Sequence, residues 1–245
     1  RAAEGAAQGL QLIVRPARCP GAGEGREPAM TVSVDDIRAA AARLRGRAIR
    51  TPLLESARLN DRLGGRLLVK PECLQRTGSF KFRGAFNTLS AMDPAVRAGG
   101  VIAYSSGNHA QGVALSAKLF GAPATIIMPH DAPELKKRNT AEYGAEVVLY
   151  DRYSENREAL GERLMAERGL TLVKPYDQES VIAGQGTVGL EIAEQCAEAG
   201  VVPDFALCPA GGGGLISGVS IALKDAFPRI AVHPAEPADF DDWGR

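Results

Sequence analysis

Short apolar runs alternate along this chain with longer stretches in which apolar residues recur at helical spacing. Ser33 and Asp36 have the spacing of a capping box and precede an apolar stripe at Ile37, Ala41 and Leu44, which predicts a first helix ending near residue 44. The later apolar runs predict buried strands at 67–69, 101–104, 124–128, 146–149, 171–173, 205–208 and 230–232. The periodic stretches predict helices at 83–92, 109–120, 133–143, 154–168, 188–199 and 215–227.

This alternation predicts an α/β fold in which parallel sheets are flanked by helices. Four glycines, Gly121, Gly144, Gly169 and Gly200, each follow a predicted helix, at the position where a left-handed residue commonly ends a helix. In open α/β sheets, ligands bind beyond the carboxyl ends of the strands, so the loops that follow the strands are the places to search for chemistry.

The charges of the chain balance, with 29 lysines and arginines against 29 aspartates and glutamates. No net field therefore favours nucleic acid or a membrane surface, and a small molecule is the expected partner. The four cysteines form no CxxC pair and the three histidines are widely spaced. Both observations are typical of a cytoplasmic protein with reduced thiols and no zinc site.

The first 30 residues are rich in Ala, Gly, Arg and Pro and contain one short apolar run, at 10–14. That run is too short to span a membrane, and the segment lacks the order of basic and apolar residues that marks a secretory signal. We expect residues 1–30 to form a disordered extension and Met30 to be the natural start of the protein.

Lys81 has the setting that points most directly to chemistry. It lies in the sequence TGSFKFRGA, residues 77–85, between Phe80 and Phe82 at a predicted junction of loop and helix. Burial and the positive end of a helix disfavour the charged form of an amine, and a neutral amine is a nucleophile for carbonyl groups. The alternative is a lysine that only carries a solvated charge on an exposed face.

A glycine-rich loop at 208–215, with the sequence CPAGGGGL, follows a predicted strand and precedes a predicted helix. The backbone N–H groups of four consecutive glycines can surround an anion, and the start of the helix adds its dipole. We therefore predict a phosphate cradle in preference to a flexible turn. The loop has neither the lysine of a Walker loop nor GxGxxG spacing.

A second loop, SSGNHAQG at 105–112, places Ser105, Ser106, Gly107, Asn108 and His109 at the start of a helix. The free N–H groups there could bind a carboxylate, while a simple N-cap is the alternative. A serine hydrolase is not expected because the chain has no GxSxG elbow. A third segment, GQGTVG at 184–189, predicts a tight turn that packs a helix against a sheet.

An amine nucleophile, a phosphate cradle and a carboxylate-binding helix start together fit pyridoxal phosphate acting on an amino acid. The motifs TGSFKFRGA, SSGNHAQG, VIAGQGT and PAGGGGL, in this order and spacing, resemble the fold-type II pyridoxal-phosphate enzymes, specifically the serine/threonine dehydratase and serine racemase group. The resemblance runs from about Thr31 to the end of the chain and includes TPLLES and EPADFDD.

The resemblance implies roles for residues of the cofactor site. Lys81 matches the Schiff-base lysine, which also moves the Cα proton. Asn108 matches the residue that binds the 3′-oxygen of the cofactor, and Phe80 matches the aromatic residue beside its ring. The glycines that match the phosphate-binding loop are Gly211, Gly212, Gly213 and Gly214.

It also implies roles for the residues around the substrate. Ser105, Gly107 and His109 fall in the loop that resembles the binder of the substrate carboxylate. Ser106 matches the residue that faces the lysine across the cofactor in serine racemases, which favours serine chemistry or racemisation.

The segment EPADFDD resembles a divalent-cation site of the same group. Glu236, Asp242 and the backbone carbonyl of Phe240 would bind Mg²⁺ or Ca²⁺ together with water. The alternative is a solvated acidic tail.

For the intact protein the resemblance implies a two-domain homodimeric ammonia-lyase. Residues 31–99 and 179–245 would form the larger domain and residues 100–178 the smaller one. The substrate would be L-serine, L-threonine or a similar hydroxy amino acid, with serine racemase and 3-hydroxyaspartate dehydratase as alternatives. We expect the chain to lack a C-terminal part that includes the partner of the pyridine nitrogen, so an inactive paralogue is a further alternative, as is a nucleotide-binding protein that uses the glycine loop.

Overall fold

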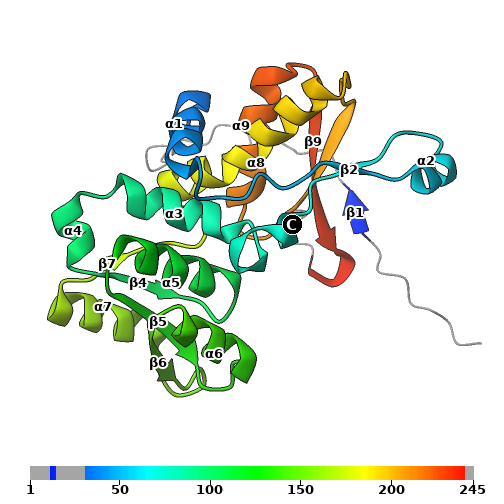
Figure 1. Cartoon of the computed structure of the whole chain (residues 1–245). Helices are drawn as coiled ribbons and strands as arrows, with labels where there is room; N and C mark the ends of the chain where they lie inside the picture. Colours follow the sequence, from blue (N-terminus) through cyan, green and yellow to red (C-terminus); the bar gives the residue numbers. More distant parts are fainter. Residues whose placement is uncertain (1–11, 15–30, 241–245) are drawn as a thin grey trace, which may run out of the picture.

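The computed structural model describes residues 12–14 and 31–240, which form an α/β protein with helices packed around the sheets (Figure 1). This confirms the predicted fold class. The strands are β1 (Leu12–Val14), β2 (Leu54–Glu55), β3 (Leu68–Val69), β4 (Val101–Tyr104), β5 (Ala124–Pro129), β6 (Glu146–Tyr150), β7 (Thr171–Leu172), β8 (Phe205–Pro209) and β9 (Ala231–Pro237). The α-helices are α1 (Val34–Leu44), α2 (Ala57–Leu63), α3 (Lys81–Ala91), α4 (Pro94–Ala98), α5 (Asn108–Phe120), α6 (Glu134–Glu142), α7 (Arg157–Arg168), α8 (Glu179–Glu198) and α9 (Gly214–Ala226). The short 3-10 helices are η1 (Glu72–Leu74), η2 (Arg76–Gly78) and η3 (Ala238–Phe240).

A four-stranded parallel sheet with the order β6-β5-β4-β7 lies entirely within residues 101–172. Successive side chains of its central strands point to opposite faces, and both faces are covered by helices. Ile126 and Met128 pack with α3 and α5, whereas Ile127 packs with Leu164 of α7. The division into domains at residues 99/100 and 178/179 stays a prediction.

A second sheet has the order β1-β9-β8, with β8 and β9 parallel and β1 antiparallel to β9. Helices α8 and α9 cover it through Val188, Ile216 and Leu223. Strand β1 lies in the segment for which we predicted disorder, and the rest of that segment is outside the described residues. Strands β2 and β3 pair antiparallel as a separate two-stranded sheet, with α2 between them in the chain.

The ends of several helices follow the sequence signals. Ser33 and Asp36 form the predicted capping box of α1. The four glycines expected after helices all have positive φ angles, between 65° and 90°. These local signals were sufficient because each depends on neighbours within one helical turn.

Helix α8 differs most from its prediction, because the segment 184–189 is helix and not a tight turn. Its glycines allow close approach by neighbouring helices. A Cβ on Gly184 would lie 2.6 Å from the Cα of Gly84 in α3, and a Cβ on Gly189 would lie 2.9 Å from the Cβ of Ala222 in α9. The glycines therefore serve contact between helices, for which a single sequence gives the same signal as a turn.

Candidate active site

Lys81 is the first residue of α3 and follows a chain segment with an unusual backbone. Thr77 has a φ of 60° and is the one non-glycine residue with positive φ among those the structure describes. Gly78 also has positive φ, after which Ser79 is extended and Phe80 begins to turn into the helix. Backbone strain of this kind is often found at functional sites, where the surrounding structure maintains it.

The side chain of Lys81 is mostly buried, and its Nζ donates a hydrogen bond to the carbonyl oxygen of Pro175 at 2.5 Å. Burial lowers the pKa of Lys81 to about 8, since the charged form loses hydration. The Nζ lies 5.3 Å from the centre of the Phe80 ring. A substantial fraction of this amine is therefore neutral under mildly alkaline conditions, as covalent chemistry with a carbonyl requires.

Lys81 lines a cavity of about 250 Å³ together with the glycine loop, residues 211–214. The loop follows β8, and α9 begins at Gly214, so the N–H groups of the first helical turn face this region. A Cβ on Gly212 would lie 2.3 Å from ring atoms of Tyr176, and one on Gly214 would lie 2.6 Å from the Tyr176 carbonyl oxygen. The close packing of Tyr176 thus explains two of the four glycines, and the phosphate cradle expected at this loop stays a prediction.

The second candidate loop joins β4 to α5 and lies outside the lining of this cavity. Asn108 is the first residue of α5, Gly107 is its N-cap, and the Oγ of Ser105 accepts a hydrogen bond from the Gly107 N–H. Ser106 is partly exposed in the same loop. The loop is near the lysine because α5 packs on α3: a Cβ on Gly112 would lie 3.1 Å from the backbone of Lys81.

His109 is buried, and its Nε2–H donates to the carbonyl oxygen of Val173 at 2.9 Å. Its pKa is lowered to about 4, first by burial and to a smaller extent by the charge of Lys81, although the bond to Val173 opposes this shift. His109 is therefore neutral at physiological pH and cannot provide a positive charge for a carboxylate. Its Nδ1 has no hydrogen-bond partner within the described part of the chain.

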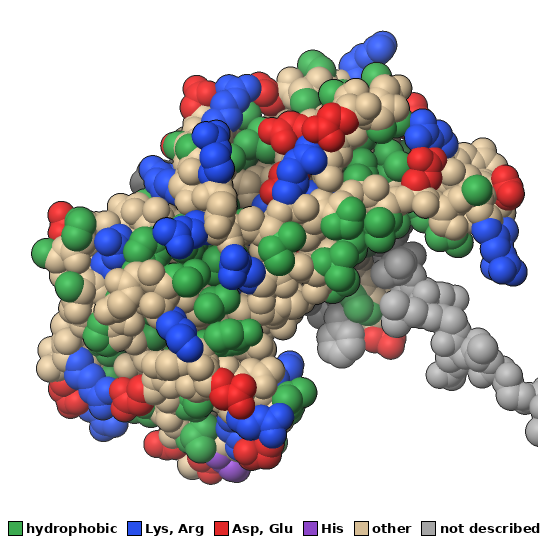
Figure 2. Space-filling model, in the orientation of Figure 1, with side chains coloured by type: hydrophobic (Ala, Val, Ile, Leu, Met, Phe, Trp, Pro, Cys, Tyr) green, Lys and Arg blue, Asp and Glu red, His purple; other side chains and the backbone are tan. Residues whose placement is uncertain are grey.

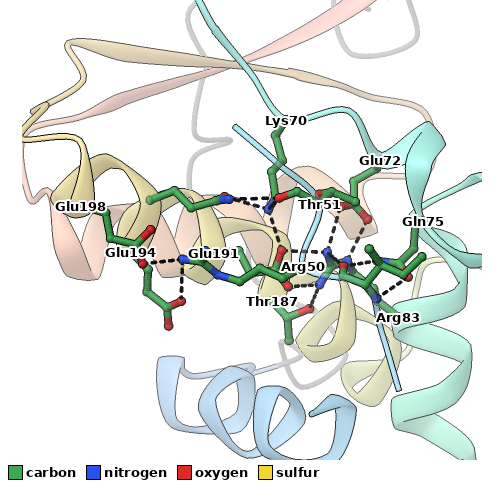
Figure 3. A network of polar contacts seen from close by, with 12 residues as sticks. Arg50, Thr51, Lys70, Glu72, Gln75, Arg83, Thr187, Glu191, Glu194 and Glu198 are labelled. Atoms are coloured by element: carbon green, nitrogen blue, oxygen red, sulfur yellow. Dashed lines mark hydrogen bonds and ion pairs between the residues drawn. The ribbon is translucent and has the colours of Figure 1, made fainter. Parts of the chain in front are cut away.

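A buried polar network fixes the helix that carries Lys81 (Figure 3). Arg83 is fully buried two residues after Lys81, and its Nε is 2.7 Å from Glu72 of η1. Its Nη1 lies 2.7 Å from Glu191 of α8, and Glu191 also pairs with Lys70 at 2.6 Å. These contacts connect α3, the helix that begins at Lys81, to η1 and α8.

No role in the cavity was predicted from the sequence for Pro175, Tyr176 or Gln185. Gln185 lies in the segment taken for a turn, so the sequence held a signal there that was misassigned. Pro175 and Tyr176 carry no local signal, because their importance depends on contacts with Lys81 and the glycine loop, which are distant in sequence.

The structure leaves the proposed cation site untested. Glu236 is buried in β9, and Asp242 lies outside the described residues. Among residues 12–14 and 31–240, no three His, Cys, Asp or Glu side chains are grouped closely enough to hold a metal ion. The cation site at Glu236, Phe240 and Asp242 stays a prediction.

The class of protein follows from this fold and from its match to a family model: residues 44–245 match the family of pyridoxal-phosphate dependent enzymes, and the chain belongs to that family. Among named proteins, it is 47% identical over 207 residues to L-threo-3-hydroxyaspartate ammonia-lyase of Saccharomyces cerevisiae, covering 84% of this chain and 62% of that enzyme. It is 44% identical to serine racemase of Schizosaccharomyces pombe, covering 85% of this chain and 63% of the racemase.

Solved structures give the same result. The structure of serine racemase from Dictyostelium discoideum superposes with a TM-score of 0.81 at 37% identity, over 86% of this chain and 67% of that protein. The structure of the T.th. threonine deaminase gives a TM-score of 0.76 at 46% identity, over 82% of this chain and 63% of the deaminase. The chain thus spans less than two thirds of the curated relatives given above. No helix of the described residues is long and apolar enough to cross a membrane.

Proposed function

We propose that this chain is a pyridoxal-phosphate-dependent ammonia-lyase that converts small hydroxy amino acids into 2-oxo acids and ammonia. The observation that carries the proposal is the cavity that Lys81, with its lowered pKa, shares with residues 211–214. The substrates we propose are L-serine, L-threonine and 3-hydroxyaspartate. The similarity to two L-threo-3-hydroxyaspartate ammonia-lyases at 47% identity supports the last of these.

The residues present fit this cofactor. The glycine loop would bind the phosphate, and Lys81, which lines the same cavity, would bind the aldehyde carbon. Phe80 would lie beside the ring, and Asn108 would bind its 3′-oxygen. The Gln185 amide lines the cavity and is buried without partners in the described structure, as expected for a group that faces a polar ligand. When bound, the cofactor supplies an electron-withdrawing ring that stabilises negative charge at the substrate Cα.

The protein groups would then bind the substrate and move one proton. The N–H groups at the start of α5, with Ser105 and Gly107, bind the carboxylate. His109, the second residue of α5, is buried and neutral. Lys81 Nζ takes the Cα proton, and the Pro175 carbonyl orients that nitrogen. Loss of the β-hydroxyl as water leaves an enamine, which takes up water and releases ammonia and the 2-oxo acid.

Racemisation of serine is a second candidate, and the presence of a serine at position 106 favours it. Ser106 lies in the loop before α5, where its hydroxyl could return a proton to the opposite face of Cα. The similarity to several serine racemases supports this alternative. A Ser106→Ala variant that loses D-serine formation and keeps ammonia release would assign racemisation to this hydroxyl.

The test is a Lys81→Ala variant compared with Lys224→Ala, which removes an exposed lysine of α9. We expect Lys81→Ala to lose the covalent cofactor label that borohydride introduces and at least ~1000-fold of ammonia release, because no other described residue of the cavity lining carries an amine. In the unmodified chain, the rate of cofactor capture should rise with pH around a midpoint of about 8. Full labelling or full ammonia release by Lys81→Ala would disprove the assignment.

A further inference from the structure

Gln185 is a buried polar side chain whose position the fold does not explain. It lies within α8 and is 1% exposed, and neither its Nε2 nor its Oε1 has a hydrogen-bond partner among the residues the structure describes. An amide buried without partners is unfavourable, and a methionine or leucine would suit the interior of the helix better. Such a group is expected to be satisfied by something that enters the site.

The part of α8 that carries Gln185 lies between α3, which begins at Lys81, and α9, which follows the glycine loop. The Nε2 of Gln185 lies 2.6 Å from the position that a Cβ on Gly84 would occupy, one helical turn after Lys81. On the other side, a Cβ on Gly218 of α9 would lie 2.6 Å from the backbone nitrogen of Gly186, so the beginning of α9 packs against this turn of α8. Gln185 also lines the cavity that contains Lys81 and the glycine loop.

The chemistry of the lining selects the kind of ligand that Gln185 would contact. Among the described residues that line the cavity, none carries a carboxylate, and Lys81 is the one with a charged side chain. The start of α9 and the glycine loop attract an anion, and an amide NH₂ adds a donor of the same kind. The oxygens of a phosphate accept hydrogen bonds from all of these donors.

We propose that Gln185 is a ligand-binding residue whose Nε2 donates a hydrogen bond to the phosphate group bound by residues 211–214. The inference rests on the proposed cofactor site and adds a side-chain donor to its backbone donors. Gln185 then destabilises the ligand-free protein, because its amide has no partner, and strengthens ligand binding in the loaded protein. These opposite effects separate a binding role from a purely structural one.

The experiment compares Gln185→Met with Gln195→Met in the 245-residue chain. Gln195 is a matched control, because it is buried in the same helix but has partners: its Oε1 accepts from Lys70 and its Nε2 donates to the carbonyl of Thr51. Thermal unfolding is measured for the ligand-free chain and with inorganic phosphate, and affinities are measured for pyridoxal phosphate and for pyridoxal, which lacks the phosphate.

We expect Gln185→Met to keep or raise the Tm of the ligand-free chain. It should lower the affinity for inorganic phosphate and for pyridoxal phosphate by roughly tenfold, which corresponds to the loss of about one charge-assisted hydrogen bond. Its affinity for pyridoxal should not change. Gln195→Met should show the reverse, with a lower Tm and unchanged phosphate binding. A Gln185→Glu variant should bind phosphate more weakly still, because it places a negative charge beside the anion.

The proposal is overturned if Gln185→Met lowers the Tm and leaves phosphate and pyridoxal phosphate affinities unchanged, which is the result for a structural residue. It is also overturned if Gln185→Met loses affinity for pyridoxal and for pyridoxal phosphate to the same extent, or if the unmodified chain binds neither phosphate nor pyridoxal phosphate. Absence of ammonia release with intact, Gln185-dependent phosphate binding would count against the proposed reaction and would support the role of Gln185.

Discussion

His109 shows how burial determines the state of a single residue near the site. Its pKa of about 4 lies below the ordinary 6.5, so between these values the unfolded chain binds a proton that the folded chain does not. The free energy of unfolding should therefore fall as pH decreases from 6.5 to 4, and His109 should contribute up to about 3 kcal/mol of that fall.

The expectation is tested by urea unfolding at about pH 7 and at about pH 4.5, because most of the His109 contribution is lost between these two values. His109→Gln is the comparison, because its amide can still donate to Val173. His130, which is exposed, provides the control substitution His130→Gln. We expect His109→Gln alone to reduce the pH dependence. An equal dependence in all three proteins would show that folding does not lower the pKa of His109.

The chemistry-bearing residues could be predicted from sequence where their type and their local setting were sufficient. Lys81 and the glycines at 211–214 were singled out because an amine between aromatic residues and a run of glycines are visible in a few positions, and the structure places them around one cavity. Tyr176 could not be found in this way. Its function in shaping the loop depends on Gly212 and Gly214, which lie far along the chain from it.

At the scale of elements, the close crossing of α3 and α8 should tolerate no added side chain. A Cβ on Gly84 would lie 2.6 Å from the Gln185 side chain and 2.9 Å from a backbone oxygen, and a Cβ on Gly184 would lie 2.6 Å from the Gly84 Cα. We expect Gly184→Ala to lower the free energy of unfolding by about 2–3 kcal/mol, because the helices must separate.

Gly65→Ala is the matched control, since nothing lies within 4 Å of its Cβ position. Urea unfolding measures both variants. If Gly184→Ala were as stable as Gly65→Ala, the two helices would not be in backbone contact in solution.

The network around Arg83 is the second feature at this scale. Arg83→Met leaves the carboxylates of Glu72 and Glu191 with fewer partners in a buried place, and we expect a loss of about 3–5 kcal/mol in stability. Arg66→Met breaks a more exposed pair with Glu55 and should cost less than about 1 kcal/mol. Equal losses in urea unfolding would contradict the buried character of the network.

Elements were predictable when a pattern of adequate length specified them. Helix α5 and strand β4 have clear patterns and lie close to their predicted bounds. Strand β2 and helix α2 were not predicted, because such short segments carry too little periodicity. Helix α8 was predicted only from residue 188, because its glycines serve contacts with α3 and α9 that a single sequence does not reveal.

At the scale of the whole molecule, charges are well mixed but apolar side chains are exposed along one strand. Figure 2 shows acidic and basic side chains interspersed over the face in view. Strand β8 is an edge strand of the described sheet, and Phe205 and Leu207 on it are 58% and 48% exposed. An exposed edge with apolar side chains favours association between chains.

We therefore expect the chain to self-associate as its concentration rises, and we expect Phe205→Glu with Leu207→Lys to reduce this. Leu135→Lys is the control, because Leu135 is similarly exposed but lies on helix α6. Light scattering across a concentration series measures the effect. If the Leu135 variant reduced association as much as the β8 variant, general charge and not the strand edge would be responsible.

The glycine contacts of α8 have a consequence for which ligands the site can accept. Both the helix of Lys81 and the helix that follows the glycine loop rest on α8 through backbone, with no flexible side chain between them at Gly184 and Gly218. The span from the backbone of Lys81 to the loop is consequently set by stacked backbones and does not depend on the rotamers of side chains between the helices. Such a site measures length: an aldehyde whose phosphate is one methylene further from the reactive carbon should fit poorly, even though both of its ends are chemically suitable.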